Sequence, residues 1–338
     1  MREVDGDYGQ QTGSGSAAKL LQECEIRLVY QPVYSTSPED ESIRGIRGTL
    51  NGDASAATYS LKVVGMEALC RPEHPSRGVL NPAALLPEIE KFPHQARELD
   101  ERVLAAVRRD SGKVAPMLEN RDLGERAARG EAFLSINTTP SSLAFKETRE
   151  EAKSAAHLLK GYGIGVVLEV TERQGFVAEE VAEGLRDIRE SGIAVAADDL
   201  GSFEAERVAT GSNEWVGERN PGPGIYPESL GSLGRLAALG IGKAPRSSLI
   251  GTEDGEIEER RMPAAKLDRK FMASILEGEQ RALDTLSDIQ EACDYPVVAE
   301  GIEHPESVER IRRLGIEMAQ GFGLSRPLPL GQYPATNA

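Results

Sequence analysis

Two adjacent carboxylates end a small-residue apolar run in the stretch AVAADDLG, residues 194–201. Like charges repel, so two ionised carboxylates held close together favour a positive charge between them. A strand followed by an Asp-capped turn into a helix would account for Asp198 and Asp199 without any chemistry. Whether Asp198 and Asp199 belong to a capped turn or to a charged site can be judged from the residues that end the other short apolar runs of the chain.

Each of those runs also carries polar residues at or near its end. They are Glu67 in VVGMEAL, Asn137 in FLSIN, Glu169 and Glu172 in VVLEVTE, Lys266 and Asp268 in AAKLD, and Glu300 and Glu303 in VVAEGIE. A single glutamate in such a place is typical of a cap or a surface position. Six successive runs of this kind indicate one shared site.

Strand-like and helix-like segments alternate over almost the whole chain, which favours βα units and a parallel sheet. No second compositional regime interrupts them, so an α/β fold with a closed barrel fits better than two open sheets. Strands are predicted at 26–34, 61–69, 132–137, 164–170, 193–199, 264–268 and 296–301. Helices are predicted at 17–25, 81–91, 96–110, within 138–163, and at 178–192, 281–294 and 305–315.

In a βα barrel the carboxyl ends of the parallel strands share one rim, where active sites are built. The strand-end residues should therefore converge, although they are far apart in sequence. Five or six carboxylates on one rim repel one another unless cations lie between them. Oxygen ligands with one Asn and no thiol favour Mg²⁺ or Mn²⁺ over zinc. A carboxylate that bridges two ions is typical of two-metal hydrolysis, and Asp198 beside Asp199 is the natural bridge.

The composition excludes several other classes of function. The 338 residues include 39 Lys+Arg and 55 Asp+Glu, a formal charge of −16, which argues against a nucleic-acid polymer or an anionic membrane as main partner. The three cysteines form no paired motif, and the four histidines are scattered, so a zinc site is not expected. No run is long enough to span a membrane and the start lacks signal-peptide character, so a cytoplasmic location is expected.

Eight blocks in order resemble the EAL domain family, bacterial phosphodiesterases that open cyclic di-GMP. The blocks are YQPV at 30–33, GMEALCR at 65–71, LSIN at 134–137, LEVTE at 168–172, ADDLG at 197–201, KLDRKF at 266–271, AEGIE at 299–303 and QGFGLSRPLP at 320–329. The tripeptide Glu-Ala-Leu alone carries no weight, whereas the ordered series is specific. The resemblance spans about 18–330 and implies a modified TIM-like (β/α)8 barrel with one antiparallel strand.

The resemblance also implies roles for individual residues. The first metal ion would be held by Glu67, Asn137, Glu169 and Asp198, and the second by Asp198, Asp199 and Glu300. Glu67, Lys266 and Glu300 would be catalytic, with Lys266 touching the attacking water or the phosphate oxygens. Glu172 would anchor the loop after Asp199. Substrate or supporting positions would be Gln31, Arg71, Glu303 and Gln320.

The expected reaction is hydrolysis of cyclic di-GMP to linear pGpG, with Mg²⁺ or Mn²⁺ as the cofactor, two per site. Ca²⁺ accepts more ligands at longer distances and activates water less well, so it is expected to bind and inhibit. A homodimer is possible. Two alternatives stay open: a non-catalytic cyclic di-GMP receptor or scaffold on the same fold, and an unrelated metal-dependent barrel hydrolase.

The sequence departs from the family pattern in two respects. An aromatic followed by Gly-Thr-Gly is usual after the Asp pair, whereas this chain has Leu200-Gly201-Ser202-Phe203. The path from Asp199 to Lys266 is also extended. The domain prediction is a tail at 1–17, a barrel at 18–332 with insertions at about 36–60 and 204–262, and a tail at 333–338.

Overall fold

The computed structural model of the chain describes residues 14–37, 61–114, 121–129, 131–170, 178–201, 265–292 and 296–332. The predicted insertion at 204–262 lies outside the described residues, as do residues 38–60 of the other insertion. The same holds for Glu172 and Cys293.

One sheet runs through the described part of the chain in the order β1-β9-β8-β7-β6-β5-β4-β2-β3. A further pairing between β1 and β2 closes eight strands into a barrel. The ninth strand, β3, pairs with the carboxyl end of β2 and is not part of the barrel. The strands are β1 (Glu25–Ser35), β2 (Val63–His74), β3 (Gly78–Val79), β4 (Ala132–Thr138), β5 (Ile164–Val170), β6 (Ala194–Leu200), β7 (Ala265–Leu267), β8 (Val297–Ala299) and β9 (Met318–Ala319).

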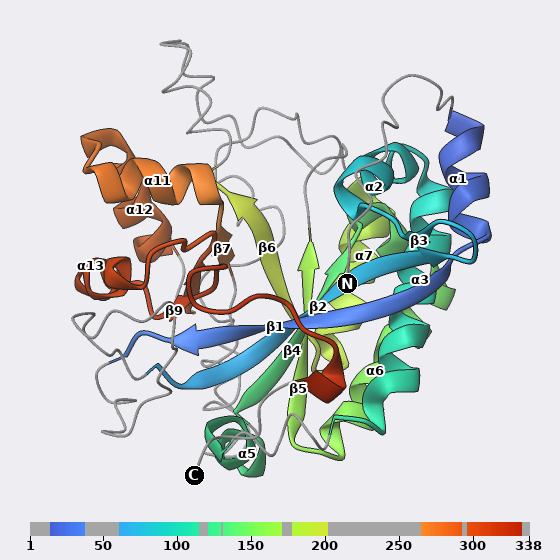
Figure 1. Ribbon diagram of the computed structural model, residues 1–338, viewed down its shortest axis with the longest axis horizontal. Helices are drawn as coiled ribbons and strands as arrows, with labels where there is room; N and C mark the ends of the chain where they lie inside the picture. The colour runs from blue at the N-terminus through green and yellow to red at the C-terminus, as the bar shows by residue number, and fades with distance from the viewer. Residues whose placement is uncertain are drawn as a thin grey trace.

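The direction of β1 distinguishes this barrel from one with all strands parallel. β1 runs antiparallel to both of its neighbours, β2 and β9. The remaining pairs around the ring, from β2 through β4 to β9, are parallel. β1 crosses the front of the barrel in Figure 1. The expected fold, a TIM-like barrel with one antiparallel strand, is confirmed.

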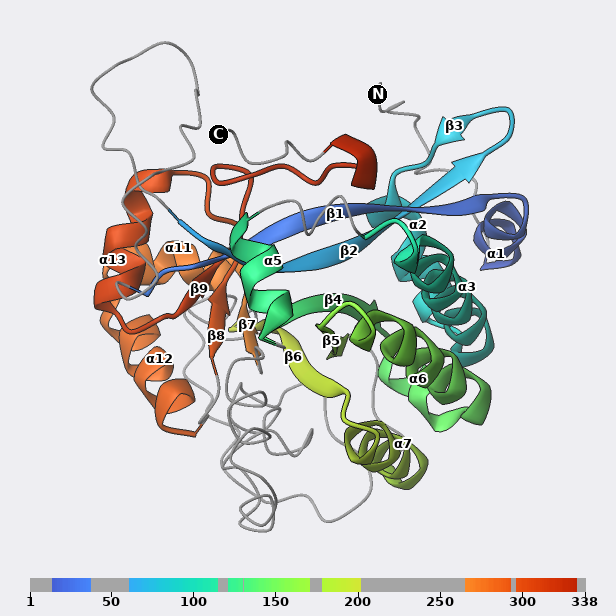
Figure 2. The same cartoon turned by 90° about the horizontal axis from the view of Figure 1, so that it is seen from below.

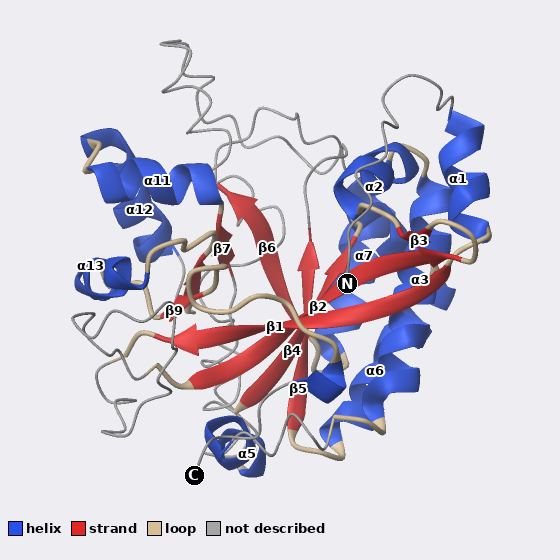
Figure 3. Cartoon of the chain, in the orientation of Figure 1, coloured by secondary structure: helices blue, strands red, loops and turns tan. Residues whose placement is uncertain are grey.

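Most of the helices lie outside the ring of strands, as Figures 2 and 3 show. None of the described helices is both long and apolar enough to cross a bilayer. The helices are α1 (Ser14–Gln22), α2 (Pro82–Glu90), α3 (Pro93–Ser111), α5 (Arg121–Ala128), α6 (Lys146–Lys160), α7 (Ala178–Glu190), α11 (Arg269–Glu277), α12 (Gln280–Ala292) and α13 (Val308–Arg313), with 3₁₀ turns η2 (Pro140–Ala144), η4 (Pro305–Ser307) and η5 (Leu330–Gln332).

Apart from the two-residue strand β3, three described elements have no counterpart in the sequence predictions. Strand β9 has two residues, too few to show an alternating pattern. Helix α5 is short, and four of its eight residues are charged. Helix α11 is separated from α12 by Gly278, which ends α11 in the left-handed conformation at φ 85°. All three elements depend on tertiary contacts more than on a local pattern.

Inward-facing apolar side chains fill the interior of the barrel. One cluster takes residues from seven strands: Val33, Val64, Phe133, Val167, Ala196, Val298 and Met318. Phe133 is accommodated because its partner on β2 is Gly65, where a Cβ would lie 2.5 Å from the ring. The other buried apolar residues pack between the strands and the surrounding helices. The barrel is therefore filled below the level at which the strands end.

Helix α5 lies at the end of the barrel where β4 and β5 begin (Figure 1) and contacts β2 and β4. Gly163, just before β5, permits this close approach. It has φ +72°, and a Cβ there would lie 1.9 Å from the Ala127 carbonyl oxygen. Gly192, just before β6, has φ +80° but no atom within 4 Å of the same position.

These two glycines give a matched test of the packing of α5. Gly192→Ala should lower the free energy of unfolding by about 1 kcal/mol, the cost of a left-handed residue with a Cβ. Gly163→Ala should cost about 1–3 kcal/mol more, because the methyl group also meets the backbone of α5. Urea unfolding of both variants measures the difference, and equal losses would show that α5 does not pack as described.

Candidate active site

The strand pleat places the candidate residues on the inner face of the barrel. Side chains alternate between the two faces of a strand, so a residue two positions after an inward apolar residue also points inward. This holds for Glu169 after Val167, Asp198 after Ala196, Glu300 after Val298 and Gln320 after Met318. A polar layer therefore follows the apolar cluster at the carboxyl ends of the strands.

Lys266 lies at the centre of this polar layer, with 2% of its side chain exposed. Its Nζ lies 2.6 Å from Glu300 Oε1, 2.8 Å from Glu169 Oε2 and 3.3 Å from Glu67 Oε2. Asp198 Oδ1 lies 3.8 Å from the same nitrogen. One ammonium group on β7 thus contacts carboxylates on β2, β5 and β6 and that of Glu300, the residue after β8.

Two amide side chains orient the Glu67 carboxylate. Asn137 Nδ2 donates to Glu67 Oε1 at 2.8 Å, and Gln320 Nε2 donates to Glu67 Oε2 at 2.8 Å. Gln31 lies directly opposite Glu67 in the β1–β2 pairing. The Gln31 side chain donates to the Ser325 carbonyl at 3.0 Å. Asn137 on β4, Gln31 on β1 and Gln320 just after β9 therefore surround Glu67 on β2 in one arrangement.

An irregularity in β6 brings Asp198 and Asp199 to the same site. In a regular strand their side chains would point to opposite faces. The pairing of β6 with β7 shifts between Ala197 and Leu200, and Asp199 has a positive φ of 55°. Oxygens of Asp198, Asp199 and Glu300 all lie within 4.8 Å of one another. The adjacent carboxylates are thus joined by a local bulge rather than by a regular strand end.

Burial opposes ionisation of most of these carboxylates. It raises the pKa of Asp198 to about 6 and that of Glu300 to about 8, against the opposing attraction of Lys266. Burial and the neighbouring Glu67 raise the pKa of Glu169 well above its usual range. For Glu67, Lys266 and the hydrogen bonds from Asn137 and Gln320 outweigh burial, and its pKa is lowered.

The Lys266 ammonium stays charged because of this surplus of carboxylates. Burial would lower its pKa, but Glu169, Glu300 and Glu67 together raise it well above its usual value. Among the described residues, five carboxylates gather with the one Lys266 ammonium, which leaves four of their negative charges uncompensated when all are ionised. A buried arrangement of this kind requires protons or cations to be stable.

The donor set fits divalent cations. Asp198 Oδ1 is buried and makes no hydrogen bond, and the neighbouring groups are carboxylate and amide oxygens. Hard oxygen ligands of this type suit Mg²⁺ and Mn²⁺. Asp198 belongs to two groups of carboxylates. It lies with Glu67 and Glu169 around Lys266, and it also lies with Asp199 and Glu300.

Two of the remaining predicted residues, Arg71 and Glu303, lie at or beyond the edge of the cluster. Arg71 follows Glu67 by four residues on β2, about 13 Å further along the same face. Its NH1 donates to the Cys70 carbonyl at 2.8 Å. Glu303 is about half exposed and forms a 2.5 Å ion pair with Arg269. Glu172 lies outside the described residues.

Asp268 does not join the cluster with the other strand-end residues. Its carboxylate caps helix α11, accepting hydrogen bonds from the backbone N–H groups of Lys270 at 2.7 Å and Phe271 at 3.3 Å. For this residue the cap interpretation is right, as for an Asp immediately before a helix. Sequence reasoning missed the ion-pair partner of Glu303, which is Arg269. Arg269 is the first residue of α11, and its place directly after the cap residue is the one feature of the sequence that points to it.

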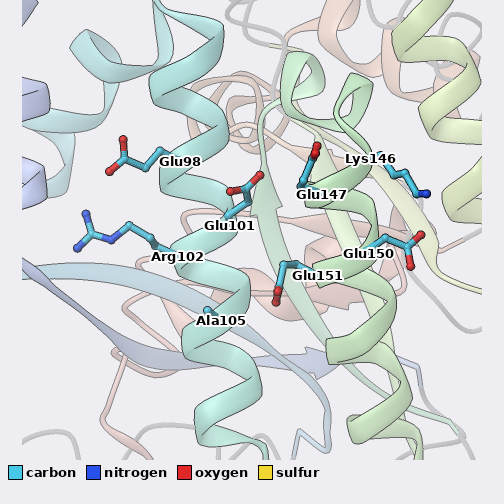
Figure 4. A pocket seen from close by; sticks show the side chains of 8 residues that line it. All are labelled: Glu98, Glu101, Arg102, Ala105, Lys146, Glu147, Glu150 and Glu151. Carbon is cyan, nitrogen blue, oxygen red and sulfur yellow. The ribbon is translucent and has the colours of Figure 1, made fainter.

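A second concave region lies away from the barrel interior, between helices α3 and α6 (Figure 4). This groove, of about 620 Å³, is lined by five glutamates together with Arg102, Lys146 and Ala105. Three of its glutamates pair with arginines: Glu101 and Glu147 with Arg97, at 3.6 Å and 3.9 Å, and Glu151 with Arg108 at 2.7 Å. None of the cluster residues lines it, so it is a separate feature of the outer surface.

Comparison with known proteins gives a family match over most of the chain. The model of the family described as EAL domain matches residues 57–206 and 256–327. The "Probable cyclic di-GMP phosphodiesterase PdeN" of Escherichia coli (strain K12) is 23% identical over 280 residues, which cover 82% of this chain and 42% of that protein. The chain thus spans less than half the length of this relative.

Solved structures share the fold. The EAL enzyme Bd1971, in its cAMP-bound form, aligns with a TM-score of 0.56 and 20% identity, over 94% of this chain and 68% of that one. The PaMucR phosphodiesterase, in a cyclic di-GMP complex, aligns with a TM-score of 0.51 and 21% identity, over 91% of this chain and 94% of that one. At these identities the likeness concerns the barrel itself.

The raised carboxyl pKa values predict how stability depends on pH in the metal-free protein. Between about pH 4.5 and pH 8, the folded protein binds a proton on Glu300 that the unfolded chain has already released. The free energy of unfolding should therefore fall as the pH rises through this range, by at most about 1.4 kcal/mol per pH unit for each such group.

Urea unfolding in the presence of a chelator, at several pH values, measures this slope. Glu300→Gln removes one titrating group and should make the slope shallower. A slope that rises with pH in the parent protein, or one that Glu300→Gln leaves unchanged, would contradict the assigned electrostatics.

Proposed function

Because the chain belongs to the EAL domain family, we propose that it is a metal-dependent phosphodiesterase that hydrolyses cyclic di-GMP to linear pGpG. The observation that carries the proposal is the group of carboxylates around the buried Lys266, in which Asp198 Oδ1 is buried and accepts no hydrogen bond from the described residues. The named relative and the phosphodiesterase bound to cyclic di-GMP support the choice of substrate.

Two divalent ions, Mg²⁺ or Mn²⁺, fit the arrangement of donors. We assign Glu67, Asn137, Glu169 and Asp198 to the first ion, and Asp198, Asp199 and Glu300 to the second. Bound ions of this kind lower the pKa of water, so that hydroxide is available near neutral pH. Ca²⁺ prefers more ligands at longer distances, and we propose that it binds here and inhibits.

The residues of the chain supply binding and charge compensation. In hydrolysis a water oxygen bonds to phosphorus, the bond to the 3′ oxygen breaks, and that oxygen takes up a proton. Negative charge grows on the phosphoryl oxygens, and the Lys266 ammonium is placed to offset it. Arg71 can hold a phosphate through two parallel hydrogen bonds, which a lysine does less well. Gln31, Glu303 and Gln320 complete the substrate side of the proposal.

Turnover of cyclic di-GMP with Mg²⁺, followed by chromatography of pGpG, tests the function. Glu67→Ala and Glu300→Ala should each lower the rate at least about 100-fold, since loss of an outer-shell partner alone costs about 10–100-fold. Glu98→Ala, in the α3–α6 groove, is the matched control and should leave the rate unchanged.

The outcomes separate the candidate functions. Binding of cyclic di-GMP without turnover in the parent protein would replace the enzyme with a receptor on the same fold. Faster turnover of a linear diester or a sugar phosphate would point to a different hydrolase. Equal losses in Glu98→Ala and Glu67→Ala would remove the carboxylate cluster from the mechanism.

A further inference from the structure

A buried carboxylate on helix α3 contacts the segment that follows Asn137. Asp100 is only 5% exposed and does not belong to the carboxylate cluster. Its Oδ2 accepts a 2.8 Å hydrogen bond from the backbone N–H of Thr139. Thr139 is the residue before η2, two positions after Asn137. Asp100 therefore joins an outer helix to the end of β4.

The strand ladder supports this end of β4 on one side only. The pairing of β4 with β5 continues through Asn137–Glu169 to Thr138–Val170. The pairing with β2 ends earlier, at Ile136–Ala68. Beyond Ile136, where the β2 pairing has ended, the hydrogen bond from Thr139 to Asp100 gives this segment a second attachment.

The position of Asn137 depends on where this segment lies. Its side-chain nitrogen donates to Glu67 Oε1, which leaves its oxygen as the donor atom available to a metal ion. A shift of the end of β4 would move this oxygen and release the hydrogen bond to Glu67. The hydrogen bond to Asp100 thus adds to the β5 ladder in fixing the geometry of Asn137 and Glu67.

Stability alone gives a weak reason to keep a carboxylate at this place. Burial raises the pKa of Asp100 to about 7, although the Thr139 N–H opposes this effect. A buried ionisable group costs free energy that an apolar side chain of similar size would not. What the Asp100 carboxylate provides, and an apolar side chain would not, is a hydrogen-bond acceptor that fixes the position of Thr139.

We propose that Asp100 is a positioning residue of the metal site. Asp100 holds the backbone at the carboxyl end of β4, so that the Asn137 side chain is in place to bind the ion. The inference rests on the metal site of the proposed function. Partners that orient metal ligands typically change metal affinity about 10–100-fold when they are removed. Asp100 touches neither the substrate nor the ions in this role.

The test is a titration of the metal-free full chain with Mn²⁺ alone, with free Mn²⁺ followed by electron paramagnetic resonance. Asp100→Ala should raise the dissociation constant at least about 10-fold. Asp100→Asn keeps an oxygen that can accept the Thr139 N–H and should stay within about 2-fold of the parent. If Asp100→Ala does not fold, Asp100→Ser takes its place with the same expectation.

Asp110→Ala is the matched control. Asp110 is also a buried carboxylate on α3, ten residues and about 15 Å further along the helix, and it accepts a hydrogen bond from the Tyr30 hydroxyl. This variant should bind Mn²⁺ as the parent does, whatever stability it loses. Unchanged affinity in Asp100→Ala, or an equal loss in Asp110→Ala, would overturn the inference while leaving the metal site in place. A parent protein that binds no Mn²⁺ would overturn the metal site and the inference together.

Discussion

Repulsion among carboxylates is the constraint on which the site depends. In the part of the chain that the structure describes, the closed barrel holds five acidic side chains at one mouth, with the Lys266 ammonium group among them. Burial, with a further contribution from the neighbouring carboxylates, raises the pKa of Glu300 and Asp198, so bound protons can relieve part of the repulsion. Divalent cations relieve it without removing the charges that bind them. The same feature therefore destabilises the metal-free protein and prepares it to bind metal ions.

The barrel imposes this arrangement through simple rules of strand geometry. Alternation puts an apolar layer inside the barrel and a polar layer two residues later. Without β1, the parallel strands would form an open sheet with free edges at β2 and β9. The pairing of β1 with β2 closes the barrel and brings Gln31 opposite Glu67. Where alternation would separate two needed carboxylates, a bulge at Asp198 and Asp199 brings them together. The hydrogen bond from Thr139 to Asp100 adds support where the β4 ladder ends.

The sequence predicts most of the strands and the convergence of their ends, because both follow from short-range patterns. Glu169 and Glu300 each stand two residues after an inward apolar residue, which alternation alone explains. Asp268 also stands at a strand end, yet it caps α11, because capping and ligation use the same residue type at the same place. The bulge at Asp199 could not be predicted, since it depends on how β6 meets β7.

Other features depend on contacts between distant segments and leave no local pattern. Strand β9 is two residues long and exists only by pairing with β8 and β1. Helix α5 is mostly defined by its contacts with β2 and β4. From the sequence, Asp100 is one acidic residue of a predicted amphipathic helix. Its contact with Thr139 is evident only from the fold.

Anomalous diffraction from crystals of the full chain soaked in Mn²⁺ tests the central claim most directly. Two peaks about 3.5–4 Å apart, both within bonding distance of Asp198, with Glu67 near one and Glu300 near the other, are the predicted result. Peaks elsewhere on the molecule, or none at this mouth of the barrel, would contradict the account.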